Sequence, residues 1–546
     1  MLVKKIKEHI IWIGLLTIFV FTAYHNSFSG EFISDDFGLL VLDKQVGEVK
    51  NIFSSTTVIP NFVRFITYRL FGFQQYYYHL INVLIHLANV ILVYFLICLS
   101  SRNNKKQLAF FTAGLFAVHP LMTESVTWIS GLAYPLYAFF ILTSFIFFII
   151  SDHRKSITLY FFSLLFFVFS LLTQPKAVVY PLIILIYNLL FQKNRKRFLN
   201  VLPYIILVIA GSFFLVFPYL SLRIKEAYLL GTKYVSGFDL SAPFISLATY
   251  LKLFIWPMNL SLYHSEPINN FTYLFSAIVI ILLIFTSFYF WKRNKELFFW
   301  LLFFITSLVF SLTPFPIASF VAERYVYLGS VGIFYIFSYF VAALGKKINS
   351  FLFPWIIISI LIIVLSIRTI KRNDDWKTLR SFWTTTVQTS PFSYQAHNNY
   401  GILLLNEGKI KQASQEFQKT IYLKKDYALA HHNLGYTYQL SGKHKEAIKE
   451  YTTAIQLDSN TWRSYVNLGG IHMQLKQYDL AVKYMKKAIE INPENPAFYE
   501  NLGIVYIYQG DYTKAGKVFA TALKLNPKST KAAYGLRLVD SKIKTR

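Results

Sequence analysis

The sequence predicts an all-helical protein in two parts, a polytopic bundle of membrane helices followed by a solenoid of repeated helix pairs. Of 546 residues, 55% are hydrophobic, 18% are aromatic and only 15% are charged, which is too apolar for an ordinary soluble protein. The long apolar runs stop near residue 370, and from residue 394 the chain repeats itself every 34 residues. We therefore expect a membrane domain over 1–370, a linker over 371–393 and a repeat domain over 394–546.

The formal net charge is +27, and much of it lies in short connections between apolar runs. Such connections face the cytoplasm and anionic lipid headgroups, so membrane lipids are expected partners and nucleic acid is not. The single cysteine, Cys98, excludes a disulfide framework within the chain and a cysteine-based metal site. Lys4, Lys5 and Lys7 precede an apolar run with no evident cleavage site, which predicts an uncleaved signal anchor.

Eleven apolar runs are long enough to cross a bilayer. They cover 9–25, 77–100, 106–121, 132–151, 156–173, 176–192, 201–221, 271–291, 297–313, 325–345 and 351–369. Basic clusters fall on every second connection, which predicts a plasma or inner membrane protein with a cytoplasmic N-terminus and extracytoplasmic repeats. Counting the apolar stretch 241–264 as a span would reverse the later charge bias, so we interpret it as a re-entrant or interfacial pair of short helices.

Two adjacent carboxylates, Asp35 and Asp36, follow the first span where it should meet water. Like charges this close disfavour joint ionisation, so the pair is a candidate acid–base site at the mouth of a membrane cavity. Ser34 and Asp35 are also good N-cap residues, so a solvated helix cap is the competing interpretation. Glu124, which returns along the outer face after the third span, is another candidate acid.

Three basic residues, Arg64, Lys176 and Arg324, are also expected on the outer side. Cations there would suit a phosphate at the membrane surface, while interfacial anchoring by arginine and tyrosine is the alternative.

The second span carries polar residues on one helical face, at spacings of three, four and three: His79, Asn82, His86 and Asn89. Hydrogen bonding between helices and the lining of a polar cavity both explain such a stripe. His119, just before Pro120, either ends its helix or lines the same cavity.

The C-terminal repeats match the tetratricopeptide pattern of two helices per unit. Glycines recur at Gly401, Gly435, Gly469 and Gly503, and small residues recur at Ala413, Ala447, Ala481 and Ala515. Four units should stack into a superhelix that residues 530–544 cap. An asparagine holds the same position in every repeat, as Asn399, Asn433, Asn467 and Asn501. This column can bind the backbone of an extended peptide, or it can bond helices internally.

As a whole, the chain resembles the TMTC-type membrane proteins with tetratricopeptide repeats, and their bacterial relatives, within the GT-C superfamily of polyprenol-dependent glycosyltransferases. The segments that carry the resemblance are 35–36, 79–86, 115–126, 174–178, 256–260, 323–328 and the four repeats. One motif departs from the family pattern. Relatives often carry Gly-Arg-x-Asp after the third span, and here the chain reads Gly131-Leu132-Ala133-Tyr134-Pro135.

The resemblance implies an inverting transfer of a sugar, commonly mannose, from a polyprenyl-phosphate donor to a serine or threonine hydroxyl of a polypeptide on the extracytoplasmic face. The acidic pair would supply the base, and the first acid, Asp35, is the usual base in related proteins. The missing arginine and aspartate leave the donor identity and any divalent metal open. Two alternatives stay beside this interpretation: a non-catalytic membrane scaffold whose repeats recruit partners, and a transferase that acts on a glycan or lipid.

Overall fold

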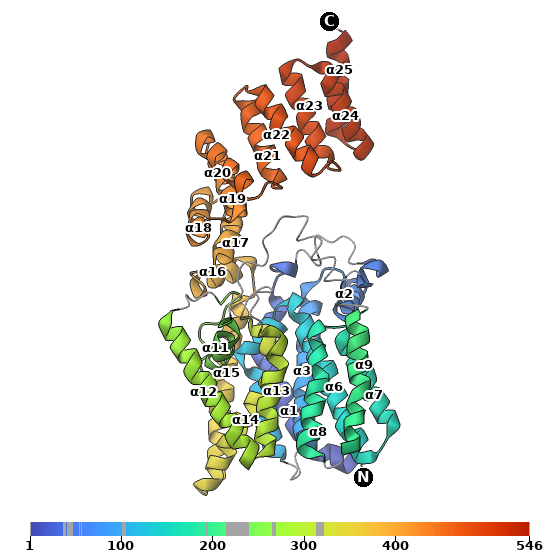
Figure 1. Ribbon diagram of the computed structural model, residues 1–546, viewed down its shortest axis with the longest axis vertical. Helices are drawn as coiled ribbons and strands as arrows, with labels where there is room; N and C mark the ends of the chain where they lie inside the picture. The colour runs from blue at the N-terminus through green and yellow to red at the C-terminus, as the bar shows by residue number, and fades with distance from the viewer. Residues whose placement is uncertain are drawn as a thin grey trace. The chain divides into compact units, whose positions relative to one another are not determined.

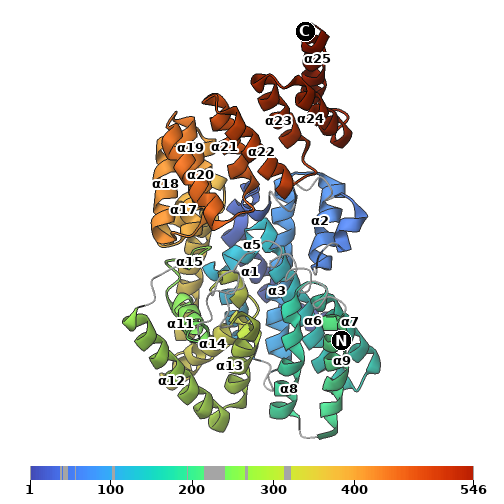
Figure 2. The same cartoon turned by 45° about the horizontal axis from the view of Figure 1, so that its top comes forward.

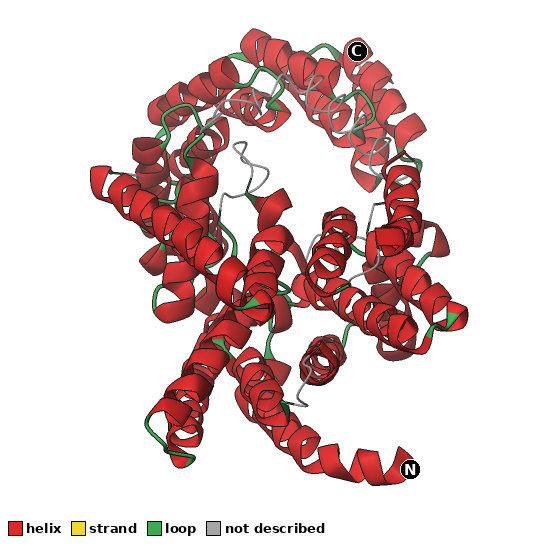
Figure 3. Ribbon diagram, turned by 60° about the horizontal axis from the view of Figure 1, so that its bottom comes forward, coloured by secondary structure: helices red, strands yellow, loops and turns green. Residues whose placement is uncertain are grey.

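The computed structural model describes residues 2–36, 40, 47–53, 55, 57–100, 105–192, 195–213, 240–264, 269–312 and 321–544. The chain divides into two compact units, Met1–Ser390 and Pro391–Arg546. The described residues form helices and connecting loops, with no strand among them (Figure 3). The predicted all-helical class is confirmed.

The first unit is a bundle of apolar helices (Figure 1). Its main helices are α1 (Leu2–Tyr24), α2 (Val58–Phe71), α3 (Gln75–Ser100), α4 (Lys106–Val118), α6 (Ala133–Arg154), α7 (Ile157–Leu171), α8 (Tyr180–Phe191), α9 (Leu202–Gly211), α11 (Ala242–Ile255), α12 (Asn270–Arg293), α13 (Lys295–Leu308), α14 (Ser330–Lys347), α15 (Leu352–Asp375) and α16 (Leu379–Thr389). Short helical turns join them: η1 (His25–Ser29), η3 (Val49–Phe53), η4 (Pro120–Met122), α5 (Thr123–Val126), η5 (Ile129–Leu132), η6 (Pro175–Val179), η7 (Arg195–Val201), η9 (Val309–Ser311) and η10 (Glu323–Val326).

Each of the predicted apolar runs contains a helix, although the described part of the 201–221 run ends at residue 213. Within the part of the chain that the structure describes, five helical segments are long and apolar enough to cross a membrane: His9–Ser29, Gln75–Ser100, Ile129–Arg154, Asn270–Arg293 and Leu352–Asp375. The other runs hold helices that are shorter or less apolar. Of the basic clusters, Arg102 and Lys193 lie outside the described residues. For Arg195, Lys196 and Arg197, only the backbone is described.

Helix ends in the bundle follow local chemistry. α4 ends at Val118 because His119 precedes Pro120, and a residue before proline is driven into the extended conformation. Asn294 separates α12 from α13, and its side chain accepts hydrogen bonds from the backbone N–H groups of Glu296 and Leu297. These ends direct the chain back across the bundle and bring distant segments to one side of it.

α12 lies at the edge of the bundle against α11 and α13 (Figure 1). Most of its apolar side chains are exposed, and they include Phe271, Leu274, Ile281 and Phe285. Exposed leucine, isoleucine and phenylalanine along a helix of spanning length fit a surface that faces lipid. α2, by contrast, lies beside the start of α3 (Figure 2) and helps to build the site described below.

Two segments differ from the prediction. The stretch 241–264 contains one helix, α11, rather than a pair, because Pro257 follows Trp256 and the described chain then continues without helix to residue 264. α15 continues to Asp375, and α16 occupies much of the segment predicted as a linker. Thr378 and Ser381 form a capping box that starts α16, and Phe382 and Trp383 bury its inner face.

The second unit has the predicted tandem repeats. Its helices are α17 (Tyr394–Asn406), α18 (Ile410–Leu423), α19 (Ala428–Leu440), α20 (His444–Leu457), α21 (Trp462–Gln474), α22 (Tyr478–Ile491), α23 (Pro496–Gln509), α24 (Tyr512–Leu525) and the cap α25 (Thr530–Lys544). The repeated glycine of each first helix receives a large side chain from the second. A Cβ at Gly503, for example, would lie 2.6 Å from Cζ of Phe519. The 34-residue period is thus a packing period, which confirms the predicted solenoid.

Candidate active site

The two neighbouring aspartates lie in different environments. Asp35 is exposed, and it has no hydrogen bond or ion pair among the described residues. Asp36 is fully buried. Its Oδ2 accepts from the backbone N–H of Ile33 at 3.0 Å, and its Oδ1 accepts from both the N–H and the hydroxyl of Ser130, the former at 2.9 Å. Burial raises the pKa of Asp36 to about 6, although the hydrogen bonds from Ser130 and Ile33 oppose that rise.

A cavity of about 370 Å³ opens beside Asp35. Its wall is built from segments far apart in the sequence, namely the acidic loop, η3, α2, the η5–α6 turn, the turn before η6 and the start of η10. The lining residues are Asp35, Asn51, Ile52, Ser55, Thr57, Asn61, Arg64, Phe65, Trp128, Ser130, Ala133, Tyr134, Gln174 and Arg324. The cavity thus brings together the predicted residues Asp35, Arg64 and Arg324.

Arg64 projects from α2 into this wall and is buried. Its Nη1 donates to Oδ1 of Asn61 at 3.1 Å, while its Nε has no hydrogen-bond partner among the described residues. Burial lowers the pKa of Arg64, and the nearby Asp36 opposes that shift. A buried guanidinium with an unused donor is a strong attractor for an anion.

Arg324 is held in place by Glu124, which is fully buried in α5. The Arg324 guanidinium bonds to one Glu124 oxygen, and the Arg324 backbone N–H donates to the other at 2.8 Å. Burial opposes the charge on Arg324, but Glu124, Tyr134 and Tyr325 together outweigh it and raise the pKa of Arg324 well above its ordinary value. Both oxygens of Glu124 bind Arg324, so this acid orients a cation in the cavity wall. Glu124 itself does not line the cavity.

Lys176 lies just behind the wall. Its Nζ donates to the Ser311 hydroxyl at 2.7 Å and lies 3.3 Å from the ring centroid of Tyr325. The ring of Tyr134, which does line the cavity, is 5.6 Å from the same ammonium. Lys176 therefore supports two tyrosine rings near the site.

The three predicted histidines bond to main-chain carbonyls and are not among the residues that line this cavity. His79 Nε2 lies 3.1 Å from the carbonyl of Gly30, and His86 Nε2 lies 3.2 Å from that of Ala117. His119 Nε2 lies 3.2 Å from the carbonyl of Phe254. Each histidine links segments of the bundle, which is the helix-bonding interpretation of the stripe.

Asn82 and Asn89 of the same stripe act alike. Asn82 donates to the carbonyl of Trp128 at 3.0 Å, and Asn89 donates to that of Pro135 at 2.8 Å. These bonds fix both ends of the η5–α6 turn against α3. The turn then presents Ser130, Ala133 and Tyr134 to the cavity.

Sequence reasoning missed Ser130 and Asn61. Ser130 precedes the motif that departs from the family pattern, and it binds Asp36 across 94 residues of sequence. The Asn61–Arg64 spacing of three on a helix was a usable signal for a paired side chain.

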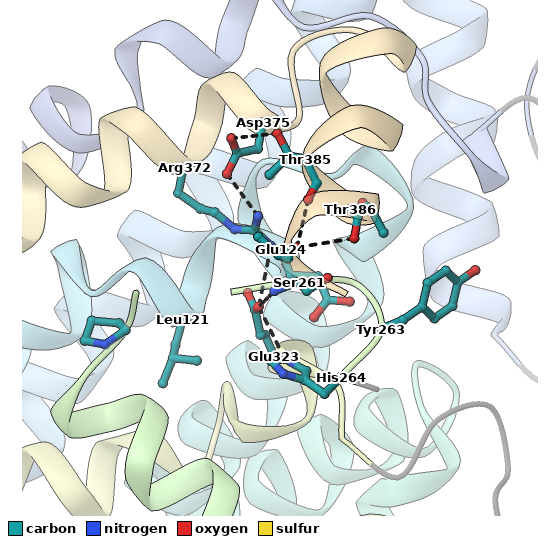
Figure 4. Close-up of polar contacts among 12 residues, drawn as sticks. Leu121, Glu124, Ser261, Tyr263, His264, Glu323, Arg372, Asp375, Thr385 and Thr386 are labelled. Atoms are coloured by element: carbon teal, nitrogen blue, oxygen red, sulfur yellow. Dashed lines mark hydrogen bonds and ion pairs between the residues drawn. The ribbon is translucent and has the colours of Figure 1, made fainter. Parts of the chain in front are cut away.

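A second buried polar cluster surrounds Glu323 (Figure 4). Glu323 Oε1 accepts from the backbone N–H of Ser261 at 2.6 Å and lies 3.5 Å from both Arg372 and His264. Arg372 also donates to Asp375 at 3.0 Å. The cluster ties the non-helical segment before residue 264 to the end of α15, and its members are not in the cavity lining.

The asparagine column of the repeats is half-buried and partly engaged. Asn433 donates to Oδ1 of Asn398 at 3.0 Å, and Asn467 donates to the Tyr451 hydroxyl at 2.9 Å. At the two ends, Asn399 accepts from Asn398 at 3.4 Å and Asn501 accepts from Lys531 at 3.0 Å.

Within the described ranges, no group of three or more histidine, cysteine, aspartate or glutamate side chains is arranged to hold a metal ion.

Family models match both parts of the chain. Residues 55–221 match the dolichyl-phosphate-mannose-protein mannosyltransferase family, a match that begins after the acidic loop. Three tetratricopeptide-repeat models match residues 428–461, 463–495 and 484–517.

Two curated relatives match over most of this chain. The protein O-mannosyl-transferase TMTC1 of Homo sapiens is 26% identical over 494 residues, covering 74% of this chain and 54% of the relative. Protein O-mannosyl-transferase F38B6.6 of Caenorhabditis elegans is 25% identical over 404 residues, covering 69% of this chain and 55% of the relative. The chain thus spans about half the length of these relatives.

Among solved structures, pilF of Pseudomonas aeruginosa is 27% identical, with a TM-score of 0.27, and covers 28% of this chain and 69% of its own. The matches to tetratricopeptide-repeat models agree with the solenoid described above. The chain is therefore similar in its first part to the dolichyl-phosphate-mannose-protein mannosyltransferase family and in its second part to tetratricopeptide repeats.

Proposed function

We propose that this protein transfers a mannosyl residue from a polyprenyl-phosphate donor to the hydroxyl of a serine or threonine in a polypeptide. The observation that carries the proposal is the cavity in which the unengaged carboxylate of Asp35 shares a wall with the guanidinium groups of Arg64 and Arg324. A carboxylate can take a proton, and guanidinium groups bind phosphate. The names of the curated relatives support the sugar and the acceptor class.

The chemistry is an inverting displacement at the anomeric carbon. The acceptor oxygen forms a bond to that carbon while the bond from carbon to phosphate oxygen breaks, and polyprenyl phosphate leaves with the electron pair. Asp35 accepts the hydroxyl proton and later releases it to water. Because the leaving group is already a phosphate, the step needs no nucleotide, and charge stabilisation by fixed cations supplies much of the catalysis.

Arg64 and Arg324 are proposed to bind the departing phosphate. Arg64 lines the cavity and is held by Asn61, and Arg324 is fixed by Glu124, so neither side chain needs to be ordered when the donor arrives. Lys176 holds the rings of Tyr134 and Tyr325 from behind the wall. Arg69 offers a matched control because it is exposed on the same helix, α2, and is absent from the cavity lining.

The repeats are proposed to bind the acceptor polypeptide. Their asparagine column already donates internal hydrogen bonds at Asn433 and Asn467. Peptide binding therefore has to use the donors and acceptors of each amide that these bonds leave unused. Replacing both residues with alanine should weaken peptide binding by the full chain without changing donor turnover. Unchanged peptide affinity would assign the column to internal bonding.

The cavity is proposed to open on the extracytoplasmic side, with the N-terminus in the cytoplasm and the repeats outside. The lining residues lie beyond the C-terminal ends of α1 and α7 and before the N-terminal ends of α3, α6 and α8, while the basic connections follow the opposite helix ends. A topology reporter fused after Arg546 should then be active only outside the cytoplasm. Cytoplasmic activity of that fusion would reverse the orientation.

The direct test uses purified full-length protein with a polyprenyl-phosphate donor that carries labelled mannose. A peptide with serine and threonine should gain label while an equal amount of polyprenyl phosphate is released, and the same peptide with alanine at those positions should stay unlabelled. Arg64→Gln should raise the donor KM by about 10- to 100-fold, because a charged hydrogen-bonding partner is lost. Arg69→Gln should leave it unchanged. Donor release with label on a glycan or lipid would favour that acceptor class, and no release with any acceptor would favour a scaffold.

A further inference from the structure

The loop that carries Asp35 is strained and is closed on itself by Asp36. Ser34 has a φ of 50°, a left-handed conformation that is costly for a residue with a Cβ atom. Two reciprocal bonds span the turn, because Asp36 N–H donates to the Ile33 carbonyl at 3.0 Å while Ile33 N–H donates to the Asp36 carboxylate at 3.0 Å. The carboxylate therefore helps to hold a conformation that Ser34 would otherwise leave.

The same carboxylate ties this turn to the η5 part of the cavity wall. Its other oxygen accepts from the backbone N–H and the hydroxyl of Ser130 in η5, and Ser130 itself lines the cavity. With two oxygens engaged by three donors, Asp36 is fully buried and turned away from the space that a substrate would fill. Charge-assisted bonds of this kind are the strong class of hydrogen bond.

The start of the loop is fixed as well. Glu31 N–H donates to the Lys377 carbonyl at 2.8 Å, and His79 of α3 binds the Gly30 carbonyl at 3.1 Å. A Cβ at Gly30 would lie 2.9 Å from Nε2 of His79, so glycine permits this close approach. The Asp35 side chain, which has no bonding partner among the described residues, thus lies between two fixed points, Glu31 and Asp36.

We propose that Asp36 is a positioning residue: by clamping the Ser34 turn to Ser130, it presents the Asp35 carboxylate to the acceptor hydroxyl. This inference rests on the proposed function, and it divides the labour between two adjacent acids. Asp35 takes the proton, and Asp36 fixes the position of the Asp35 carboxylate. Arg64, the charged group that faces Asp36 from α2, supports the ionised clamp.

The test weakens the clamp by changing Ser130, so that both acids remain in place. Ser130→Ala deletes the hydroxyl bond to Asp36 and should lower kcat by up to about 100-fold, because displacement of a catalytic group by about 1 Å is that costly. The donor KM should stay unchanged. Ser130→Thr keeps a hydroxyl and should recover most of the lost kcat, which a general packing defect would not do. Ser29→Ala, which removes an exposed hydroxyl from η1, should have no effect.

Asp36→Asn and Asp35→Asn complete the comparison. Asp36→Asn should lower kcat to the level of Ser130→Ala, while Asp35→Asn should be more severe. Full kcat in Ser130→Ala, or a loss that threonine does not restore, would overturn the clamp. A loss in Asp36→Asn as deep as in Asp35→Asn, with Ser130→Ala fully active, would make Asp36 itself a base. Full activity of Asp35→Asn would instead refute the proposed function.

Discussion

Glu124→Gln tests whether Glu124 is a buried counter-ion or a catalytic acid. Glu124 is fully buried, and both of its oxygens bind Arg324, whose side chain is 14% exposed. The substitution leaves the guanidinium in place without its compensating charge. Removal of one partner from a buried ion pair costs about 3–5 kcal/mol, so we expect a large loss of stability together with a loss of transfer.

The assay is thermal unfolding of the purified protein in detergent, followed by circular dichroism of its helices. The unfolding midpoint of Glu124→Gln should fall sharply, and the double variant Glu124→Gln/Arg324→Gln should recover part of the loss because it removes the unpaired charge. Glu31→Gln, at an exposed carboxylate on the acidic loop, should leave the midpoint unchanged. A Glu124→Gln protein as stable as the parent but inactive in transfer would refute the counter-ion role and restore Glu124 as an acid–base group.

Two further predictions concern the repeats, measured on the fragment of residues 391–546. Glu450 accepts a hydrogen bond from His431 at 2.7 Å and raises the pKa of His431 above its ordinary value, against the effect of burial. Stabilisation by the pair is therefore complete below the unfolded pKa of about 6.5 and is lost as pH rises through the folded pKa, so Glu450→Gln should reduce the free energy of unfolding more at pH 5.5 than at pH 8.5. An equal effect at both pH values would refute this linkage. Gly503→Ala should destabilise the fragment by about 1–3 kcal/mol because its Cβ meets the Phe519 ring, whereas Gly470→Ala, whose Cβ meets nothing within 4 Å, should stabilise it by about 0.5–1 kcal/mol. Equal effects of the two substitutions in urea unfolding would contradict the packing argument.

The sequence allowed the fold to be predicted because its signals are local and periodic. Apolar runs locate the helices of the bundle, and the 34-residue spacing of Gly401 and its equivalents gives the repeats. α16 was not predicted because its inner face is short. Phe382 and Trp383 are buried by tertiary packing, which the composition of the segment does not reveal.

The candidate site was predictable only in part. Asp35, Arg64 and Arg324 carry charge at the ends of apolar runs, and their chemistry marks them without knowledge of the fold. The difference between Asp35 and Asp36 was not visible, because it depends on Ser130, which is 94 residues away from Asp36. The role of Glu124 likewise depends on Arg324, which is 200 residues distant. Spacing along the chain cannot report such pairs.

The central claim is that the carboxylate of Asp35 takes the acceptor proton in a mannosyl transfer. The most direct measurement is the single-turnover rate of transfer by purified Asp35→Asn protein, with donor binding measured on the same sample. Asparagine keeps the size of the side chain and removes the proton acceptor, so the rate should fall by about 10²- to 10⁴-fold while donor binding stays unchanged. A rate equal to that of the parent protein would contradict the claim and leave Asp35 as an exposed residue of a helix cap.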